Sequence, residues 1–250
     1  MLKGRRRRGQ PFPDAWRNTI VARCGWWDRL DSAERGRLEV RVAHLVAALR
    51  WEGAGGYEVT DEVRVVVAAH ACRLIMELDE DAYRRIGAVV VYRHPVVSRA
   101  LRSFGGGIVS DTPVPIHGET RSGGPVVLAW SALTADARHP ERGRNVVYHE
   151  FAHQLDLADG VLDGMPHLRD PTLRRRWSAV IGAVHDRLIA HHDPLLGDYA
   201  TTNHGELFAV ATERFFTRPA DVEAVHPDLY WALAGFYRQD PAARLDRPAR

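Results

Sequence analysis

The sequence is poor in the features that define several protein classes. Its 250 residues contain only two cysteines, Cys24 and Cys72, which do not form a CxxC pair, so a disulfide framework and a cysteine-based zinc knuckle are excluded. No apolar run approaches the ~18 residues of a membrane span. No apolar segment of about 7 to 15 residues follows the arginine-rich start, as it would in a signal peptide. We therefore expect a protein of the cytoplasm that does not enter a membrane.

The sequence also lacks a large net charge. The formal charge is +2, and much of the basic excess lies in the run from Arg5 to Arg8. Neighbouring like charges without apolar partners are typical of a solvated, disordered tail, which we favour over a nucleic-acid-binding arm. We therefore do not expect nucleic acid as a partner. We predict a basic disordered tail over residues 1–10, a single domain over 11–241 and a C-terminal tail over 242–250.

Helical periodicity dominates both ends of the sequence. Apolar residues recur at helical spacing after Asp31, which forms with Glu34 the pattern of a capping box. A second helix after Thr60, its N-cap, is apolar nearly all round and is expected to be buried. We interpret His70 within it as a hydrogen-bonded core histidine. Further helices are predicted from Arg144 to about Ala158, Pro171 to about His192, Glu206 to about Phe216, and Asp228 to Arg238.

Strand signals occupy the middle of the sequence. The β-branched stretch from Ile86 to Val97 predicts a strand. Residues 105–130 contain two strand-like runs around a Gly/Ser turn, for which a hairpin is the simplest interpretation; Pro113 and Pro115 restrict the first run to an edge or an irregular ribbon. The order of elements predicts an α+β fold with a small mixed or antiparallel sheet packed against several helices.

One predicted helix carries a metal-binding pattern, HExxH. His149 and His153 are four residues apart, so they project from one helix face and can share one metal ion. Glu150 lies beside the first ligand without being on the metal, where a carboxylate can take a proton from a water on the ion. Asp156 returns to the same face and is predicted to hold a ligand imidazole through its ring N–H.

The third ligand has two candidate positions, with a histidine as a substitute. Asp159 follows His153 by six residues, but the pattern that uses this spacing needs glycine where this chain has Asp156. Glu206 begins a mostly apolar helix, where a carboxylate is best explained by a cation. His204 is a possible substitute, although a solvated loop histidine explains it more simply. Glu213, on the same face as Glu206, is interpreted either as an acceptor outside the ligand set or as a salt-bridge partner.

Four stretches carry a family resemblance: "TDEVRVVVAAHACRL", "GPVVLAW", "GRNVVYHEFAHQLD" and "DYATTNHGELFAVATERFF". In this order they resemble the Mlc titration factor A family of zinc-dependent peptidases, and the similarity runs from about Phe12 to Pro241. The resemblance implies a zincin-like fold with the HExxH helix at the active site. It also implies one Zn²⁺ per chain, an aminopeptidase-like activity and a cytoplasmic location.

The resemblance further implies roles for individual residues. His149, His153 and Glu206 would bind the zinc ion, Glu150 would be the catalytic base, and the Tyr199 hydroxyl would donate a hydrogen bond to the transition state. Partners would be a peptide or protein substrate and, because the namesake binds the repressor Mlc, a transcriptional repressor.

Two hypotheses follow for the function. The first is a zinc peptidase, in which the strand "GGPVVLAW" lines the cleft and an extended substrate adds to it at Val127 and Leu128. The second is a regulatory binding protein that sequesters a transcriptional repressor, with a structural zinc site. Glu150 separates them, because a structural site has no need of a base beside an open coordination position.

Overall fold

The computed structural model describes most of the chain, namely residues 11–79, 81–98, 102–104, 108–110, 114–116, 118–119 and 124–247. The predicted tail over residues 1–10, with its arginine run, lies outside the described residues, as do residues 248–250. No helix in the described ranges is both long enough and apolar enough to cross a bilayer.

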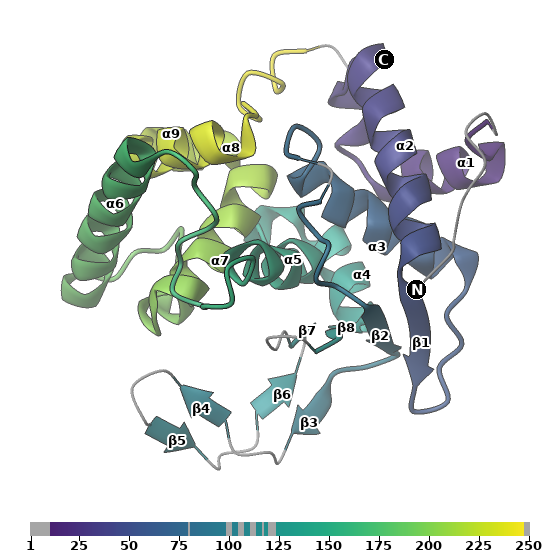
Figure 1. Ribbon diagram of the computed structural model, residues 1–250, viewed down its shortest axis with the longest axis horizontal. Coiled ribbons are helices and arrows are strands. Elements are labelled where there is room, and N and C mark those ends of the chain that lie inside the picture. Colours follow the sequence, from purple (N-terminus) through teal and green to yellow (C-terminus); the bar gives the residue numbers. More distant parts are fainter. Residues whose placement is uncertain are drawn as a thin grey trace.

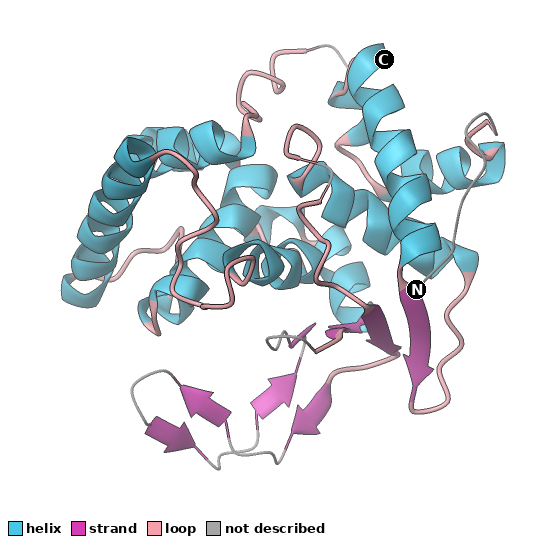
Figure 2. Cartoon of the chain, in the orientation of Figure 1, coloured by secondary structure: helices cyan, strands magenta, loops and turns pink. Residues whose placement is uncertain are grey.

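Helices dominate the described structure, and the strands gather along one side of them (Figures 1 and 2). The helices are α1 (Asp14–Arg23), α2 (Ser32–Ala48), α3 (Asp61–Leu74), α4 (Trp130–Arg138), α5 (Val146–Asp156), α6 (Pro171–Ala190), α7 (His204–Thr217), α8 (Pro219–Val225) and α9 (Pro227–Tyr237), with 3-10 turns η1 (Trp27–Arg29), η2 (Pro140–Arg142) and η3 (Asp198–Thr201). The strands are β1 (Arg50–Ala54), β2 (Ala88–Tyr92), β3 (Val96–Ser98), β4 (Arg102–Phe104), β5 (Ile108–Ser110), β6 (Val114–Ile116), β7 (Gly118–Glu119) and β8 (Val126–Ala129). The predicted α+β class is confirmed.

The main sheet is mixed, with strand order β1-β2-β8-β7. Strands β1, β2 and β8 run parallel, while β7 pairs antiparallel with β8. The predicted hairpin is wrong for its first run, because Pro115 lies in β6, which pairs with β3 and not with β8. Strands β3 and β6 form one two-stranded ribbon, and β4 and β5 form another. The prediction that the sheet is confined to the middle of the chain is wrong for β1. The sequence of β1, RWEGA, does not alternate between apolar and polar residues, so it gave no strand signal. The segment is a strand because it pairs in parallel with β2, to which it is connected through helix α3.

Two helix starts confirm the capping signals in the sequence. The Asp31 carboxylate accepts from the backbone N–H of Glu34 at the start of α2, and the Glu34 carboxylate accepts from the N–H of Asp31, both at 2.8 Å. Thr60 caps α3 in the same way, through the N–H of Val63. Helix α3 is buried on nearly all sides, as its apolar sequence predicts, and His70 is buried within it.

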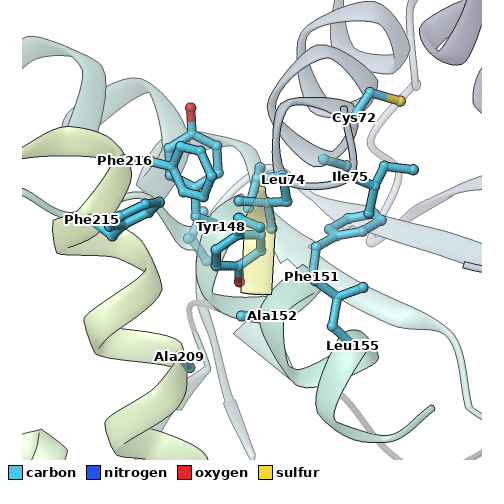
Figure 3. Close-up of a cluster of buried hydrophobic side chains, with 14 of the residues drawn as sticks. Cys72, Leu74, Ile75, Tyr148, Phe151, Ala152, Leu155, Ala209, Phe215 and Phe216 are labelled. Carbon is cyan, nitrogen blue, oxygen red and sulfur yellow. The ribbon is translucent and has the colours of Figure 1, made fainter. Parts of the chain in front are cut away.

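Helices α5 and α7 pack against each other in the centre of the molecule (Figures 1 and 3). Tyr148 of α5 contacts Phe216 of α7, with ring centroids 5.5 Å apart. Phe151, on the other side of α5, meets Tyr83 edge to face at 5.1 Å. These aromatic contacts exclude water and fix α5 between α7 and the segment that follows α3. Polar residues on α5 and α7 are therefore held in a constant relation to one another.

The segment after Pro241, predicted as a C-terminal tail, packs against the start of α2 over its described residues. The buried Arg244 guanidinium pairs with the buried carboxylate of Glu34, with N–O distances of 2.9 and 3.0 Å. Arg247 reaches the other oxygen of Glu34 at 2.7 Å. Glu34 therefore joins the capping box of α2 to residues near the end of the chain.

Glu34→Ala should destabilise the protein more than Asp31→Ala. Asp31→Ala removes one cap and should cost about 1 kcal/mol. Glu34→Ala also leaves the guanidinium of Arg244 buried without its carboxylate, for which about 3 to 5 kcal/mol is expected. Urea unfolding of both variants measures the difference, and equal losses of unfolding free energy would show that the Arg244 contact contributes nothing.

Candidate metal centre

The HExxH sequence lies on α5, whose first turn is fixed by Asn145. The side-chain oxygen of Asn145 accepts from the backbone N–H groups of Val147 and Tyr148, both at 3.1 Å. This cap satisfies two of the donors that a helix start leaves without partners. His149 and His153 follow one turn apart, with ring centroids 4.8 Å apart and their Nε2 atoms separated by 3.2 Å.

The third group comes from α7, which also begins at an asparagine. Asn203 accepts from the backbone N–H of Glu206 at 2.9 Å and so fixes the first turn of α7. Glu206 Oε2 lies 3.1 Å from His149 Nε2 and 3.4 Å from His153 Nε2. Among the candidates for the third ligand, it is Glu206 that the structure brings to the histidines.

The three atoms fit a tetrahedral metal ion. Their separations of 3.1, 3.2 and 3.4 Å compare with the roughly 3.3 to 3.4 Å expected between neighbouring ligands at ~2.0 to 2.1 Å from tetrahedral zinc. Two imidazoles and one carboxylate form a donor set that suits zinc and leaves a further coordination position. The side chains of His149 and Glu206 are only 13 % and 16 % exposed, so an ion held there is shielded from bulk water.

Glu213, in the third turn of α7, contacts the first histidine of the site. Its Oε1 lies 2.9 Å from His149 Nδ1, and its Oε2 accepts from the backbone N–H of Asn145 at 2.6 Å. When His149 Nδ1–H donates to this carboxylate, the lone pair of Nε2 is directed at His153 and Glu206. Both interpretations that the sequence left open fit this contact: Glu213 is a hydrogen-bond acceptor behind the first histidine and becomes an ion-pair partner when that histidine is protonated.

The electrostatics of the site favour positive charge at the point where the three atoms meet. Burial alone lowers the pKa of His149, but hydrogen bonds with Glu206 and Glu213 raise it well above its ordinary value. Burial alone raises the pKa of Glu206, and hydrogen bonds with His149 and His153 bring it far below its ordinary value. A carboxylate and an imidazole in this geometry stabilise positive charge whether a proton or a metal ion carries it.

Glu150 and Tyr199 come from different elements and differ in exposure. Glu150 is buried, with 4 % of its surface exposed, on the helix that carries both histidines. Tyr199 belongs to η3, just before α7; it is 52 % exposed, and its ring centroid lies 6.0 Å from that of His149. Tyr199 is therefore accessible from solvent and adjacent to the first histidine.

Asp156 has different contacts from those predicted. It is fully buried, and its Oδ2 accepts from the backbone N–H of Gly164 at 2.8 Å. Within the described residues no hydrogen bond joins it to an imidazole, and His153 Nδ1 has no hydrogen-bond partner. Burial raises the pKa of Asp156 to about 7, and the Gly164 N–H opposes this. Asp156 therefore holds the loop after α5.

The two other candidates for the third ligand, Asp159 and His204, are not part of the group of three ligand atoms and have other contacts. Asp159 accepts from the backbone N–H of Val161 at 3.0 Å and borders a cavity of about 500 Å³ at the far end of α5. None of the three grouped ligand residues lines that cavity. His204 packs against His185, with ring centroids 4.6 Å apart.

The hypothesis that a substrate strand adds to β8 at Val127 and Leu128 is wrong for this arrangement. Strand β8 pairs with β2 on one side through Val126–Ala129. On the other side Val127 and Leu128 pair with Glu119 and Gly118 of β7. Both edges of β8 are therefore occupied at these residues, and β7 is the edge strand. The sequence signal for β7 was hidden by the turn residues that surround its two residues.

The sequence reasoning missed Asn145 and Asn203. Each asparagine immediately precedes a helix that contributes a group to the site, which is a recognised start signal for helices. The asparagine signal was therefore present in the sequence. The contact of the Asn145 N–H with Glu213 was not, because it joins residues 68 positions apart and local spacing does not reveal such contacts.

A helix with HExxH, a glutamate from a second helix and a small mixed sheet beside them define a zincin-like metallopeptidase architecture. The chain belongs to the family of glucose-regulated metallo-peptidases M90, whose model matches residues 1–238. This confirms the resemblance seen in the sequence.

Several relatives match the chain over most of its length. An uncharacterized protein of Synechocystis sp. is 31 % identical over 237 residues, which cover 93 % of this chain and 86 % of the relative. The Mlc titration factor A of Serratia proteamaculans is 28 % identical, covering 87 % of this chain and 85 % of the relative. That of Klebsiella pneumoniae is 29 % identical, covering 86 % and 83 %.

Gly164→Ala should destabilise the protein more than Gly160→Ala. Both glycines have positive φ, +76° and +104°, so a Cβ is expected to cost about 1 to 2 kcal/mol at either position. Only at Gly164 would the Cβ also meet backbone, 2.4 Å from the carbonyl oxygen of His204. Thermal unfolding compares the two variants; equal losses would show that the loop yields without disturbing the start of α7.

Proposed function

We propose that this protein is a zinc-dependent peptidase with one Zn²⁺ per chain, held by His149, His153 and Glu206. The observation that carries the proposal is the convergence of three donor atoms, 3.1 to 3.4 Å apart, beside a buried Glu150. Membership of a metallopeptidase family supports the same conclusion. The substrate class is a peptide or protein, and the activity is aminopeptidase-like.

The ion, when bound, supplies a Lewis acid that polarises a peptide carbonyl and lowers the pKa of water toward ~7. The protein groups supply proton transfer and orientation. Glu150 accepts a proton from the attacking water and later delivers it to the leaving amine. Because Glu150 is buried, its carboxylate interacts more strongly with nearby positive charge than it would in bulk water.

Tyr199 and Glu213 support the reaction from outside the ligand set. The Tyr199 hydroxyl, on an exposed ring beside His149, donates a hydrogen bond to the oxyanion that develops on the substrate carbonyl. Glu213 accepts from His149 Nδ1 and keeps that imidazole in the tautomer and orientation that present Nε2.

A second candidate function is the binding of a transcriptional repressor. Relatives named Mlc titration factor A, at 28 to 29 % identity, favour this role. In this case the zinc site would stabilise the fold, and capture of the repressor would be the biological activity. The two functions differ in whether they need Glu150.

Glu150→Gln should slow peptide cleavage by orders of magnitude while leaving zinc bound. The amide has nearly the same shape but cannot accept the proton, and loss of a general base is expected to lower kcat by about 10² to 10⁴. Metal analysis of the purified variant and digestion of a peptide library measure the two effects. Cleavage at the wild-type rate would rule out Glu150 as the base.

The same variant separates the two candidate functions. A repressor-binding protein with a structural zinc should capture its partner equally well with glutamine at position 150. Because an aminopeptidase needs a free α-amino group at its substrate, N-acetylation of the library peptides should block cleavage; unchanged cleavage would indicate an endopeptidase.

Glu206→Gln should weaken zinc binding without unfolding the protein. The substitution removes the anionic ligand but keeps the side chain's shape, and Asn203 still caps α7 through the backbone N–H of residue 206. Zinc content after dialysis against a chelator should fall well below one per chain. As the control, Glu52→Gln changes an exposed carboxylate on β1 and should retain the ion. Full retention by Glu206→Gln would exclude Glu206 as a ligand.

A further inference from the structure

We propose that His70, a buried histidine on α3, is a positioning residue for the metal centre and acts through Asn145 and Glu213. This inference rests on the proposed function, because it concerns the same site. The residues that orient His149 would then come from three helices. Besides α5 and α7 they would include α3, which lies earlier in the chain.

The first link joins the metal ligand to the start of its own helix. His149 Nδ1 lies 2.9 Å from Glu213 Oε1, and the backbone N–H of Asn145 donates to Glu213 Oε2 at 2.6 Å. Both oxygens of one carboxylate are therefore engaged, and they cannot rotate independently. The position of the Asn145 backbone consequently fixes the plane of the carboxylate that orients His149.

The second link determines the orientation of the Asn145 amide. Its Oδ1 accepts from Val147 and Tyr148, so the other end of the amide is the Nδ2 donor. Nδ2 lies 3.1 Å from His70 Nδ1. His70 Nδ1 must accept this hydrogen bond, because an amide nitrogen has only donors to offer.

The third link shows that His70 is suited to that role. With Nδ1 as the acceptor, the ring proton is on Nε2, which lies 3.8 Å from the weak acceptor Cys24 Sγ. Burial, with a smaller contribution from the charge of Arg73, lowers the pKa of His70 to about 3. The imidazole therefore stays neutral and remains an acceptor at physiological pH.

The ring of His70 is itself held in place. It meets Tyr148 edge to face at 5.2 Å and Trp26 at 5.7 Å. The hydroxyl of Tyr148 accepts from Arg73, one turn after His70 on α3. His70 is thus a fixed acceptor between α3 and α5, and the chain His70, Asn145, Glu213, His149 connects it to the metal ligand through buried contacts.

The test compares His70→Phe and Asn145→Ser in the full-length protein, with zinc affinity measured by competition with a chromophoric chelator. Phenylalanine keeps a packed ring but removes the acceptor. Serine keeps an N-cap for α5 but removes the Nδ2 donor. Each should weaken zinc binding about tenfold, the lower end of the effect of residues behind metal ligands. The double variant should bind no more weakly than either single one, because both changes break the same link.

Thr60→Ala is the matched control. Thr60 caps α3, the helix that carries His70, through the N–H of Val63, and among the described residues no hydrogen bond joins its side chain to the site. This variant should lower the thermal stability of the metal-free protein while leaving zinc affinity unchanged. If His70→Phe and Asn145→Ser behave like Thr60→Ala, the role of His70 is structural only and the inference is overturned.

The outcomes also separate this inference from the proposed function. If the wild-type protein has no affinity for zinc, both fail. If it binds zinc and cleaves peptides but both variants bind zinc as tightly as wild type, only the positioning role fails. The spectrum of the cobalt-substituted protein gives a second measure, since a displaced His149 should change the visible bands of Co²⁺ in the variants and not in Thr60→Ala.

Discussion

The candidate metal centre depends on the packing of α5 against α7. Neither helix holds a complete ligand set, and Glu206 lies 57 residues from His149 in the sequence. What brings the groups together is the apolar contact between the helices, where Tyr148 meets Phe216 and the small residues Ala152 and Ala209 are fully buried (Figure 3). Because interhelical distance follows the size of the side chains at the contact, the packing sets the ligand separation to within the few tenths of an ångström that metal geometry tolerates.

The charges at this contact explain why a cation belongs there. Glu150, Glu206 and Glu213 are all largely buried and close to two histidines. Burying carboxylates without compensating positive charge is strongly unfavourable. A divalent ion compensates part of this charge, and proton-sharing with the imidazoles compensates part of it in the ion's absence. The same carboxylates that define the site are thus tolerated in the core because positive charge, carried by an ion or by the imidazoles, lies among them.

Local sequence signals predicted the helices and the first two candidate ligands, and tertiary contacts decided the rest. The capping box at Asp31 and the HExxH spacing depend on neighbours within one turn, so they could be read directly. Asp156 has the right helical angle to reach an imidazole, yet its carboxylate bonds the Gly164 N–H, a partner supplied by the returning loop. Spacing gives the face of a helix on which a residue lies but cannot say which group from elsewhere competes for it. The same reason hid β1, whose pairing with β2 crosses a whole helix.

The positions of the ligands within their helices give the caps a functional meaning. Glu206 is the third residue of α7 and His149 the fourth of α5, so both lie at helix starts, where fraying is greatest. If the first turn of either helix frayed, the candidate ligand in it would move by more than the narrow range of metal–ligand distances permits. Both helices begin at an asparagine whose side chain bonds that turn. The helix dipole also stabilises the carboxylate of Glu206 in the first turn. Helix packing sets the distance between α5 and α7, and the two capping residues, which are not among the candidate ligands, hold the first turns in place; Asn145 in addition carries the contact to Glu213.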